Sequence, residues 1–349
     1  MASRQHDERP LVLGVPARGL ARTQAESLAT ALGRERARHP IHLEIVGADE
    51  APSAPLHDDH IAENRSELRR LHRLLRDGAV DTVIHRGFDV RGEVPDGLRI
   101  AAVLARGKPY EVLISPHGAT LDLMDDDECL GVVHLRTRAQ ILDYRPELET
   151  EIIPGDAGDW LNAMIDGRVD ALVAPGAAIE QLGLQTQVSE IFPVEMVVPG
   201  PGAGVLVCMA REDDELTARR LRKLHDPRTA CEYTAECALI EALGGPWERP
   251  LGVLARSDGD HLTLHTMAAS PDGSEILRET MASPADDPCR TGSEAAALLI
   301  QQGALDILSG YGTDDGIDGD SGDEWCDAIS GMLPGAPDEA EWDAEFDEE

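Results

Sequence analysis

Three short stretches of the sequence combine residue types that can do chemistry. Asp89 lies just beyond the strand-like DTVIH, where a doubly wound sheet places its ligand crevice. A lone carboxylate at such a point is as often a turn or a cap as a catalyst. The run HDDH at 57–60 offers metal-ligand side chains, but four adjacent polar residues more often form a solvated turn. The run PGPGAG at 199–204 lacks the Lys-Ser/Thr of a phosphate loop and leads into a strand, which favours a tight crossover between domains.

The six cysteines show no CxxC pair and no metal-ligand spacing. In a cytosolic chain this pattern predicts reduced, mostly buried thiols and no structural zinc site. Cys231 and Cys237 lie six residues apart in a helical segment, so they do not share a face and are expected to be core residues.

The chain has 349 residues, of which 42% are hydrophobic and 3% aromatic, with 31 basic against 66 acidic residues and a formal net charge of −35. Such a polyanion is not expected to bind nucleic acid by neutralising phosphates, and few aromatics are present for stacking on bases. No run approaches the roughly 18 apolar residues that span a bilayer, and MASRQHDERP lacks the apolar stretch of a signal peptide. We therefore expect a cytoplasmic, globular protein without nucleic-acid or membrane partners.

The acidity has two parts. Residues 311–349 hold 15 acidic residues and no basic ones, and the first 310 residues are still strongly acidic. Lys108 and Lys223 are the only lysines, so nearly all the positive charge is arginine. This pattern suits a halophile-like protein, whose charge repulsion is screened by salt, or simply an acidic cytosolic protein from a source with arginine-biased composition.

Alternating strand-like and helix-like segments must position the candidate residues. The first two thirds predict strands at 10–15, 41–47, 81–87, 98–104, 110–116, 130–135, 149–155 and 170–176. Helical spacing predicts helices at 22–38, 63–78, 138–148, 159–169 and 177–184. This alternation implies parallel or mixed sheets covered by helices, and two further strands are expected to meet at a Gly/Pro hinge within 194–211.

The pattern changes after Asp213. Two helices at 214–225 and 227–245 precede three alternating strands at 252–257, 261–270 and 275–281, and one helix at 293–308 closes the unit. This predicts a smaller α+β domain, followed by a Gly/Asp-rich tail that we expect to be disordered.

Three stretches of the sequence, in the same order along the chain, resemble the motifs of a known family. VIHRGFDVRGEVPDGLRI (83–100) resembles V-H-S-M-K-D-x-P-x-x-x-P-x-G-L of hydroxymethylbilane synthase, also called porphobilinogen deaminase. Residues 130–184 resemble the family's G-T-S-S-L-R-R and the R-G-N-V-x-T-R and A-G-L-x-R-L-G-L segments that follow it. HDPRTACEYTAECALIEALGGPWERPLG (225–252) resembles the start of the family's third domain. The resemblance covers residues 11 to 310.

The resemblance implies both a fold and a reaction. The fold has two α/β domains like periplasmic binding proteins, expected at 10–103 plus 197–213 and at 108–193, a smaller α+β domain at 217–310 and the acidic tail at 311–349. The family condenses four porphobilinogens into a linear tetrapyrrole, releasing ammonia, on a dipyrromethane cofactor thioether-linked to one cysteine. An aspartate stabilises the positive pyrrole intermediates, and arginines with a lysine bind the pyrrole carboxylates.

This sequence keeps part of the family pattern. Asp89 stands at the catalytic aspartate, with His85 and Pro95 matching beside it, and Arg136 stands at the first arginine of L-R-R, a substrate-binding position. Several other motif positions are replaced, most of them basic in the family: Pro16, Arg18, Phe88, Thr137, Pro154 and Trp160. Trp247 aligns with the cofactor cysteine and cannot form the thioether, so the covalent anchor is expected to be absent.

These departures predict a synthase-like protein of porphyrin biosynthesis whose ordinary activity is impaired. The alternative is a catalytically inactive paralogue that binds a small anionic pyrrole or tetrapyrrole, and a third interpretation is an interaction protein that uses its acidic tail. Arg18 and Arg86 are new positive charges in two motifs and are candidates to replace lost arginines. Cys237 is a poor substitute anchor because a thiol in the middle of a helix is expected to pack inward, and we expect a monomer.

Overall fold

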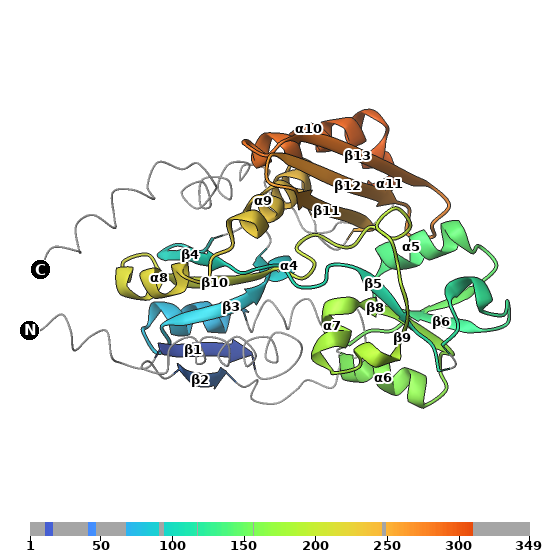
Figure 1. Cartoon of the computed structure of the whole chain (residues 1–349), viewed down its shortest axis with the longest axis horizontal. Coiled ribbons are helices and arrows are strands. Elements are labelled where there is room, and N and C mark those ends of the chain that lie inside the picture. The colour runs from blue at the N-terminus through green and yellow to red at the C-terminus, as the bar shows by residue number, and fades with distance from the viewer. Residues whose placement is uncertain are drawn as a thin grey trace, which may run out of the picture.

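Two five-stranded sheets of similar topology form the larger part of the protein (Figure 1). In each sheet the fourth strand in spatial order is antiparallel to both of its neighbours. The structure is a computed structural model that describes residues 11–16, 41–46, 68–90, 94–116, 118–155, 157–245 and 249–309. The third sheet is smaller and antiparallel. The fold class expected from the sequence, two α/β units with a smaller α+β unit, is confirmed.

Sheet 1 has the order β2-β1-β3-β10-β4. Its strands are β1 (Leu11–Pro16), β2 (Ile41–Val46), β3 (Thr82–Arg86), β4 (Leu98–Val103) and β10 (Leu206–Arg211). β1 runs parallel to β2 and β3, whereas β10 is antiparallel to both β3 and β4. β3 and β4 are rich in Val, Ile, Leu and Ala and are almost wholly buried, as is typical of strands covered on both faces.

Helices cover both faces of sheet 1. Leu71, on the helical residues 68–76, packs in the same core cluster as Val83. Leu221, on α8 (Glu215–Arg222), packs in the cluster that contains Ile84. Because successive side chains of a strand point to opposite faces, the two helices lie on opposite sides of the sheet.

Sheet 2 repeats this arrangement in the order β7-β6-β8-β5-β9. Its strands are β5 (Glu111–Ile114), β6 (Cys129–Val132), β7 (Glu149–Ile152), β8 (Ala171–Pro175) and β9 (Val188–Ile191). The helices of this unit are α5 (Leu135–Tyr144), α6 (Ala157–Ile165) and α7 (Gly176–Gln181), with 3₁₀ turns at Leu121–Leu123 and Gln185–Gln187. β5 is the antiparallel strand here, as β10 is in sheet 1. The chain therefore crosses between the sheets twice, through residues 104–110 and 192–205.

The third unit is a meander of β11 (Leu251–Ser257), β12 (His261–Ala269) and β13 (Ile276–Pro284). It carries α9 (Pro227–Ala242), α10 (Pro288–Gln301) and α11 (Ala304–Ser309). Asp226 and Asp287 cap α9 and α10 by accepting hydrogen bonds from the backbone N–H of Thr229 and Arg290, and each is followed by a proline at the first helical position. α9 is buried on nearly every side, because it lies between this meander and sheet 1.

The third unit also contacts the second. Ala139 of α5 forms one apolar cluster with Val198 of the second crossover and Met267 of β12. Gln140 of α5 donates to the Val198 carbonyl at 3.0 Å and accepts from its N–H at 2.8 Å. An Arg278–Asp143 ion pair at 2.8 Å joins β13 to the same helix. Helix α5 is thus held by the second crossover and by the third sheet.

Some local expectations were wrong. The single helix expected at 293–308 is broken, because Gly303 adopts a φ of 95° between α10 and α11. The segment 194–198 is a turn rather than a strand, and the preceding strand β9 ends earlier, at Ile191, before Pro193. The helix expected at 22–38, the HDDH run and the tail at 311–349 lie outside the described residues, and the limits assigned to the three domains stay a prediction.

Candidate functional site

The two sheets present corresponding edges to each other. At the edge of sheet 1, β3 ends at Arg86, which pairs with Leu206 at the start of β10. At the edge of sheet 2, β8 ends at Pro175, which pairs with Glu111 at the start of β5. We call the residues around these ends (85–90, 106–111, 133–137 and 199–205) the interdomain face. Both crossovers begin or end there, so two chain segments join its two sides.

Asp89 lies on the short helix α4 (Gly87–Val90), directly after β3. The Arg86 guanidinium binds its carboxylate in a bidentate manner, with Nε donating to Oδ2 and Nη2 donating to Oδ1, both at 2.7 Å. The Asp89 side chain is only 12% exposed. Both carboxylate oxygens are therefore occupied by a cation from the same turn of chain.

The turn that carries Asp89 is fixed by its neighbours. The Tyr233 hydroxyl of α9 donates to the Gly87 carbonyl oxygen at 2.6 Å. A Cβ at Gly87 would lie 3.0–3.1 Å from atoms of Val205, Gly202 and Tyr233, so a larger residue there would require these neighbours to shift. Phe88, at the position of the family's lysine, packs against the apolar core instead of presenting a cation.

His85, one residue before Arg86, forms a buried pair with His72 of the helical segment 68–76. Their Nε2 atoms lie 3.1 Å apart and the rings meet edge to face. Burial lowers the pKa of His85 to about 3, with the neighbouring His72 adding to this, and lowers the pKa of His72 to about 4. Both rings are neutral near pH 7, so one can donate a hydrogen bond to the other.

Arg136 lies in the first turn of α5 and is buried, with 10% of its side chain exposed. Its Nη2 donates to Glu111 Oε1 at 3.3 Å. The guanidinium also covers Gly200 of the second crossover, where a Cβ would come within 2.5 Å of Arg136 Cζ. Burial raises the pKa of Glu111 and lowers the pKa of Arg136, and each partner opposes the shift of the other.

Four buried polar atoms around Arg136 have no hydrogen-bond partner within the described part of the chain. They are Arg136 Nε, Glu111 Oε2, His134 Nδ1 and Thr137 Oγ1. Burial lowers the pKa of His134 well below its usual value, and the charges of Arg136 and Arg86 add to this shift. The positive charges of Arg86, at the end of sheet 1, and Arg136, on α5 beside sheet 2, thus both act on His134. Unpaired buried donors beside a helix N-terminus can bind one carboxylate oxygen of a ligand.

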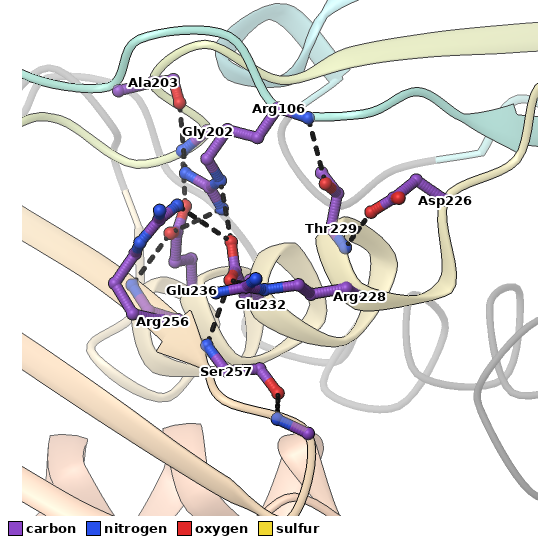
Figure 2. Close-up of polar contacts among 12 residues, drawn as sticks. Arg106, Gly202, Ala203, Asp226, Arg228, Thr229, Glu232, Glu236, Arg256 and Ser257 are labelled. Carbon is purple, nitrogen blue, oxygen red and sulfur yellow. Dashed lines mark hydrogen bonds and ion pairs between the residues drawn. The ribbon is translucent and has the colours of Figure 1, made fainter.

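A second, denser cluster lies behind the interdomain face (Figure 2). Arg106 of the first crossover pairs with Glu236 of α9 through Nη2 at 2.8 Å and lies 3.1 Å from Glu232 Oε2 through Nε. Its Nη1 donates to the Ala203 carbonyl of the second crossover at 3.0 Å, and its backbone N–H donates to Thr229 Oγ1. One guanidinium therefore ties both crossovers to α9.

Backbone donors complete this cluster. Glu236 accepts from the N–H groups of Gly202 at 2.8 Å and Ala255 at 2.9 Å, and Glu232 accepts from Ser257 at 2.9 Å. Arg228 and Arg256, whose side chains are 58% and 38% exposed, also pair with Glu232, and Figure 2 shows both beside it. We call Arg106, Glu232, Glu236 and the groups bound to them the crossover network.

Other predicted positions are less informative. Trp160 of α6 is partly buried against the core of sheet 2 and its Nε1 has no hydrogen-bond partner among the described residues. Arg18 and Trp247 lie outside the described residues. Arg86 does not present an unpaired charge, because it binds Asp89.

Among the described cysteines, Cys129, Cys208, Cys231 and Cys237 are free. The expectation of reduced thiols was wrong for Cys289, which is disulfide-bonded. Cys231 and Cys237 are 2% and 1% exposed, which confirms that they are core residues, and burial raises the pKa of both thiols. No described group of three metal-ligating side chains is present, and no described helix is long and apolar enough to cross a membrane.

A separate hollow of about 310 Å³ lies beside the interdomain face of sheet 2. Gly176, Val112 and Val188 contribute to its wall, together with Lys108. Lys108 pairs with Glu180 at 3.3 Å, so this cation is also engaged by the protein's own carboxylate.

The roles of Asp89 and Arg136 come from family motifs and stay a prediction, and the sequence did not indicate the groups that bind these two side chains. Arg86 was noticed as a positive charge, and its spacing of three residues from Asp89 is a signal for an ion pair on one helical turn. Glu111 and Arg106 gave no local signal, because their partners lie 25 and more than 120 residues away in the sequence.

Two α/β units joined by two crossovers, with buried charged groups between them and a third α+β unit behind, define a three-unit α/β protein. The family model described as "Porphobilinogen deaminase, dipyromethane cofactor binding domain" matches residues 11–219. The chain belongs to the porphobilinogen deaminase family.

Individual relatives agree with this assignment. A protein named porphobilinogen deaminase from Desulforudis audaxviator is 34% identical and covers 86% of this chain and 97% of the relative. One of the same name from Rubrobacter xylanophilus is 32% identical and covers 85% and 96%. Among solved structures, an ABC transporter from Parabacteroides distasonis is a distant likeness, at 12% identity and a TM-score of 0.38, covering 88% of this chain and 97% of that one.

Proposed function

We propose that the protein is a hydroxymethylbilane synthase-like member of tetrapyrrole biosynthesis in which the stepwise condensation of four porphobilinogens is impaired. The observation that carries this proposal is the bidentate ion pair between Arg86 and Asp89. A carboxylate stabilises a developing cation only to the extent that its charge faces that cation. With both oxygens bound to a guanidinium at 2.7 Å, the charge of Asp89 is largely offset before any pyrrole arrives.

The described residues fit the family's cofactor poorly. A dipyrromethane has two pyrroles and therefore four carboxylates. Among its described residues the interdomain face offers two guanidinium nitrogens without a hydrogen bond, at Arg136 and at Arg106, the second of which lies against Glu232, and one such hydroxyl, at Thr137. Arg86 and Lys108 are already paired with protein carboxylates. We derive no catalytic step through the cofactor for this chain.

The covalent anchor is also proposed to be absent. Trp247 stands at the position of the family's cysteine. Cys208 and Cys237 are buried, and burial raises the pKa of the Cys208 thiol to about 12. Cys129 begins β6 at the edge opposite the interdomain face. None of these three thiols combines exposure with a position beside Asp89.

The residues fit the binding of a small anionic ligand better. Arg136 Nε and Thr137 Oγ1 provide donors for one carboxylate at the N-terminus of α5, and a charge-assisted hydrogen bond of this kind contributes about 1.5–3 kcal/mol. We therefore keep a second candidate function, an inactive paralogue that binds a carboxylated pyrrole or tetrapyrrole. The four unpaired buried atoms are the specific observation that favours it.

The direct test of impairment combines intact-mass spectrometry with a porphobilinogen turnover assay on the purified protein. We expect the mass of the unmodified chain and no measurable turnover. A mass excess equal to two linked pyrroles, together with turnover that Asp89→Ala abolishes, contradicts the proposal. Turnover that Asp89→Ala leaves intact contradicts the role carried over to Asp89.

Calorimetry with porphobilinogen separates a binding protein from one whose interdomain face binds nothing. We expect saturable binding that Arg136→Met weakens by at least 10-fold, because Arg136 supplies the unpaired donor. The matched control is Arg290→Met on α10, which removes an exposed arginine far from the interdomain face. Absence of binding to the unmodified chain rules out the second candidate function for this ligand.

A further inference from the structure

The hollow beside sheet 2 combines an apolar lining with one charged pair. Its volume is about 310 Å³. Val112 of β5 and Ile179 of α7 are buried residues of its lining, and Ile191 at the end of β9 adds an apolar side chain that is 58% exposed. Lys108 and Glu180 supply the charges. Apolar surface with a few polar groups is the usual lining of a small-molecule site, and we call this place the β9 hollow.

A β-bulge in β9 shapes the β9 hollow. Ile191 pairs with Val112 and Val188 pairs with Ile114, so the two pairs are three residues apart on β9 but only two apart on β5. Because paired residues point to the same face of a sheet, the extra residue brings Val188 and Ile191 to one face, and both line the hollow. The Ser189 hydroxyl donates to a backbone carbonyl of β5 at 3.2 Å and so holds the bulge. Bulges of this kind are over-represented beside active sites, where they re-aim side chains.

Lys108 and Glu180 form an ion pair that a ligand can enter. Lys108 Nζ and Glu180 Oε1 lie 3.3 Å apart, and about half of each side chain is exposed. A solvated pair of this kind contributes little to stability, so replacing it costs little. A purely anionic ligand that bound Lys108 would leave Glu180 without its cation. A molecule that carries both a carboxylate and an ammonium gives each side chain a new partner.

The net charge of the protein and the size of the hollow favour the same class of ligand. The chain carries a formal charge of −35, which repels polycarboxylates but not a zwitterion, whose own charges cancel. The volume of about 310 Å³ lies at the lower end of the range for ligand pockets, about 300–1,000 Å³, which suits a molecule of amino-acid size.

We propose that the β9 hollow binds a small zwitterion with an apolar side chain, of the kind represented by a branched-chain α-amino acid. Its carboxylate binds Lys108 and its ammonium binds Glu180, in place of the ion pair between them. Its side chain packs against Val188 and the exposed Ile191.

Methyl NMR of the full chain, with isoleucine labelled selectively with carbon-13, tests the proposal with L-leucine as the probe. The Ile191 signal, assigned by its loss in Ile191→Val, reports on the hollow, and the signal of Ile300 on α10 is the remote reference. Isocaproate, which lacks the ammonium, and isoamylamine, which lacks the carboxylate, are the matched probes. Lys108→Met and Glu180→Gln each remove one charge from the exposed pair, and Lys223→Met, at the only other lysine, is the control.

We expect the Ile191 signal to shift saturably with millimolar L-leucine while the Ile300 signal stays in place. The apparent dissociation constant should rise at least about fivefold in Lys108→Met and in Glu180→Gln, because each removes one charge-assisted contact, and should not change in Lys223→Met. Isocaproate and isoamylamine should each bind at least about fivefold more weakly than L-leucine. These two probes act on the unmodified chain, so the proposal is tested even if a variant does not fold.

The results that overturn this proposal differ from those that overturn the proposed function. An Ile191 signal that does not respond to L-leucine overturns it, and so does equal binding of isocaproate, which would assign the hollow to simple anions. Loss of the response in Arg136→Met also overturns it and places leucine at the interdomain face. Porphobilinogen turnover enters none of these readouts, because Arg136 and Asp89 do not line the hollow.

Discussion

The crossover network and the cluster around Arg136 are both buried and charged, but they differ in how completely their polar atoms are used. Glu236 receives two backbone N–H groups and a guanidinium within 2.9 Å. Glu111 receives a single contact, at 3.3 Å, and its Oε2 has no partner among the described residues. The protein's own groups engage nearly every polar atom of the first region, where Arg106 Nε alone lacks a hydrogen bond among the described residues although it lies 3.1 Å from Glu232 Oε2. The second region has four such atoms.

This difference separates positioning from recognition. Buried charges that make many hydrogen bonds fix the geometry of the segments that carry them, and here those segments are the two crossovers and α9. Buried donors left unpaired impose a desolvation cost that a ligand can offset by binding to them. We infer that the crossover network sets the relation between the two α/β units. In the proposed binding function, Arg136, Thr137 and His134 are the groups that contact the ligand.

The largest predicted effect comes from deleting the cation of the crossover network. Arg106→Met leaves Glu232 and Glu236 buried without their shared guanidinium, and breaking such a group costs about 3–5 kcal/mol. Arg136→Met should cost no more than about 2 kcal/mol, because Arg136 makes a single contact with Glu111, at 3.3 Å, whereas Arg106 contacts Glu232, Glu236 and the Ala203 carbonyl at 2.8–3.1 Å. Guanidinium unfolding followed by circular dichroism measures both.

The pair of variants is its own control, since each replaces a buried arginine by an apolar side chain of similar length. Equal losses of unfolding free energy would show that the two regions contribute alike, and the contrast drawn above would be wrong. A larger loss for Arg136→Met would reverse it.

The glutamates give the next largest effect. Glu236→Gln places an amide N–H₂ against groups that are themselves donors, and we expect a loss of about 2–3 kcal/mol. Glu111→Gln should change the unfolding free energy by less than about 1 kcal/mol, because Oε2 makes no hydrogen bond to the described residues. The same substitution releases Arg136 from its anionic partner, so porphobilinogen binding should tighten about 10-fold in calorimetry. Unchanged or weaker binding would mean that Glu111 orients Arg136 rather than competing for it.

Much of the fold followed from the sequence. Continuous apolar runs such as LRIAAV and amphipathic runs such as ELTARRLR determine their elements locally, and the structure has both where they were expected. The choice of Asp89 and Arg136 as site residues came from short motifs and stays a prediction. The partners of these residues did not, because an ion pair such as Arg106–Glu236 joins residues that become neighbours only when sheet 1 packs on the third unit. The break at Gly303 was missed because a single glycine inside an apolar helical pattern does not reveal its own φ.

The pH dependence of stability distinguishes the regions further, because the interdomain side holds buried histidines. The pKa values of His85 and His72 are lowered to about 3 and about 4, below the usual 6.5 that applies in the unfolded chain. Between these values the unfolded chain binds more protons, so the unfolding free energy falls as the pH drops below 6.5. Each histidine contributes a slope of up to about 1.4 kcal/mol per pH unit near pH 5.5.

Denaturation at several pH values between 5.5 and 7.5 measures this slope. His85→Asn should reduce it by about one histidine's share, whereas His261→Asn, at an exposed position on β12, should leave it unchanged. A slope that His85→Asn does not alter would place the titrating groups elsewhere.

The Arg86–Asp89 contact is expected to have the smallest effect on stability, although it has the largest proposed effect on function. Arg86 and Asp89 form an ion pair three residues apart, and the arginine side chain is 35% exposed. Arg86→Ser should therefore lower the unfolding free energy by less than about 1 kcal/mol, since partly solvated pairs contribute little. It also leaves Asp89 with an unoccupied carboxylate facing the interdomain face. If Arg86 matters only for folding, porphobilinogen affinity will not respond. If it masks Asp89, calorimetry should show at least a threefold change in affinity that Arg290→Ser on α10 does not produce. If the Arg86–Asp89 pair hardly affects stability but changes affinity, it has a role in ligand recognition. The crossover network is expected to do the opposite, because its charges stabilise the fold.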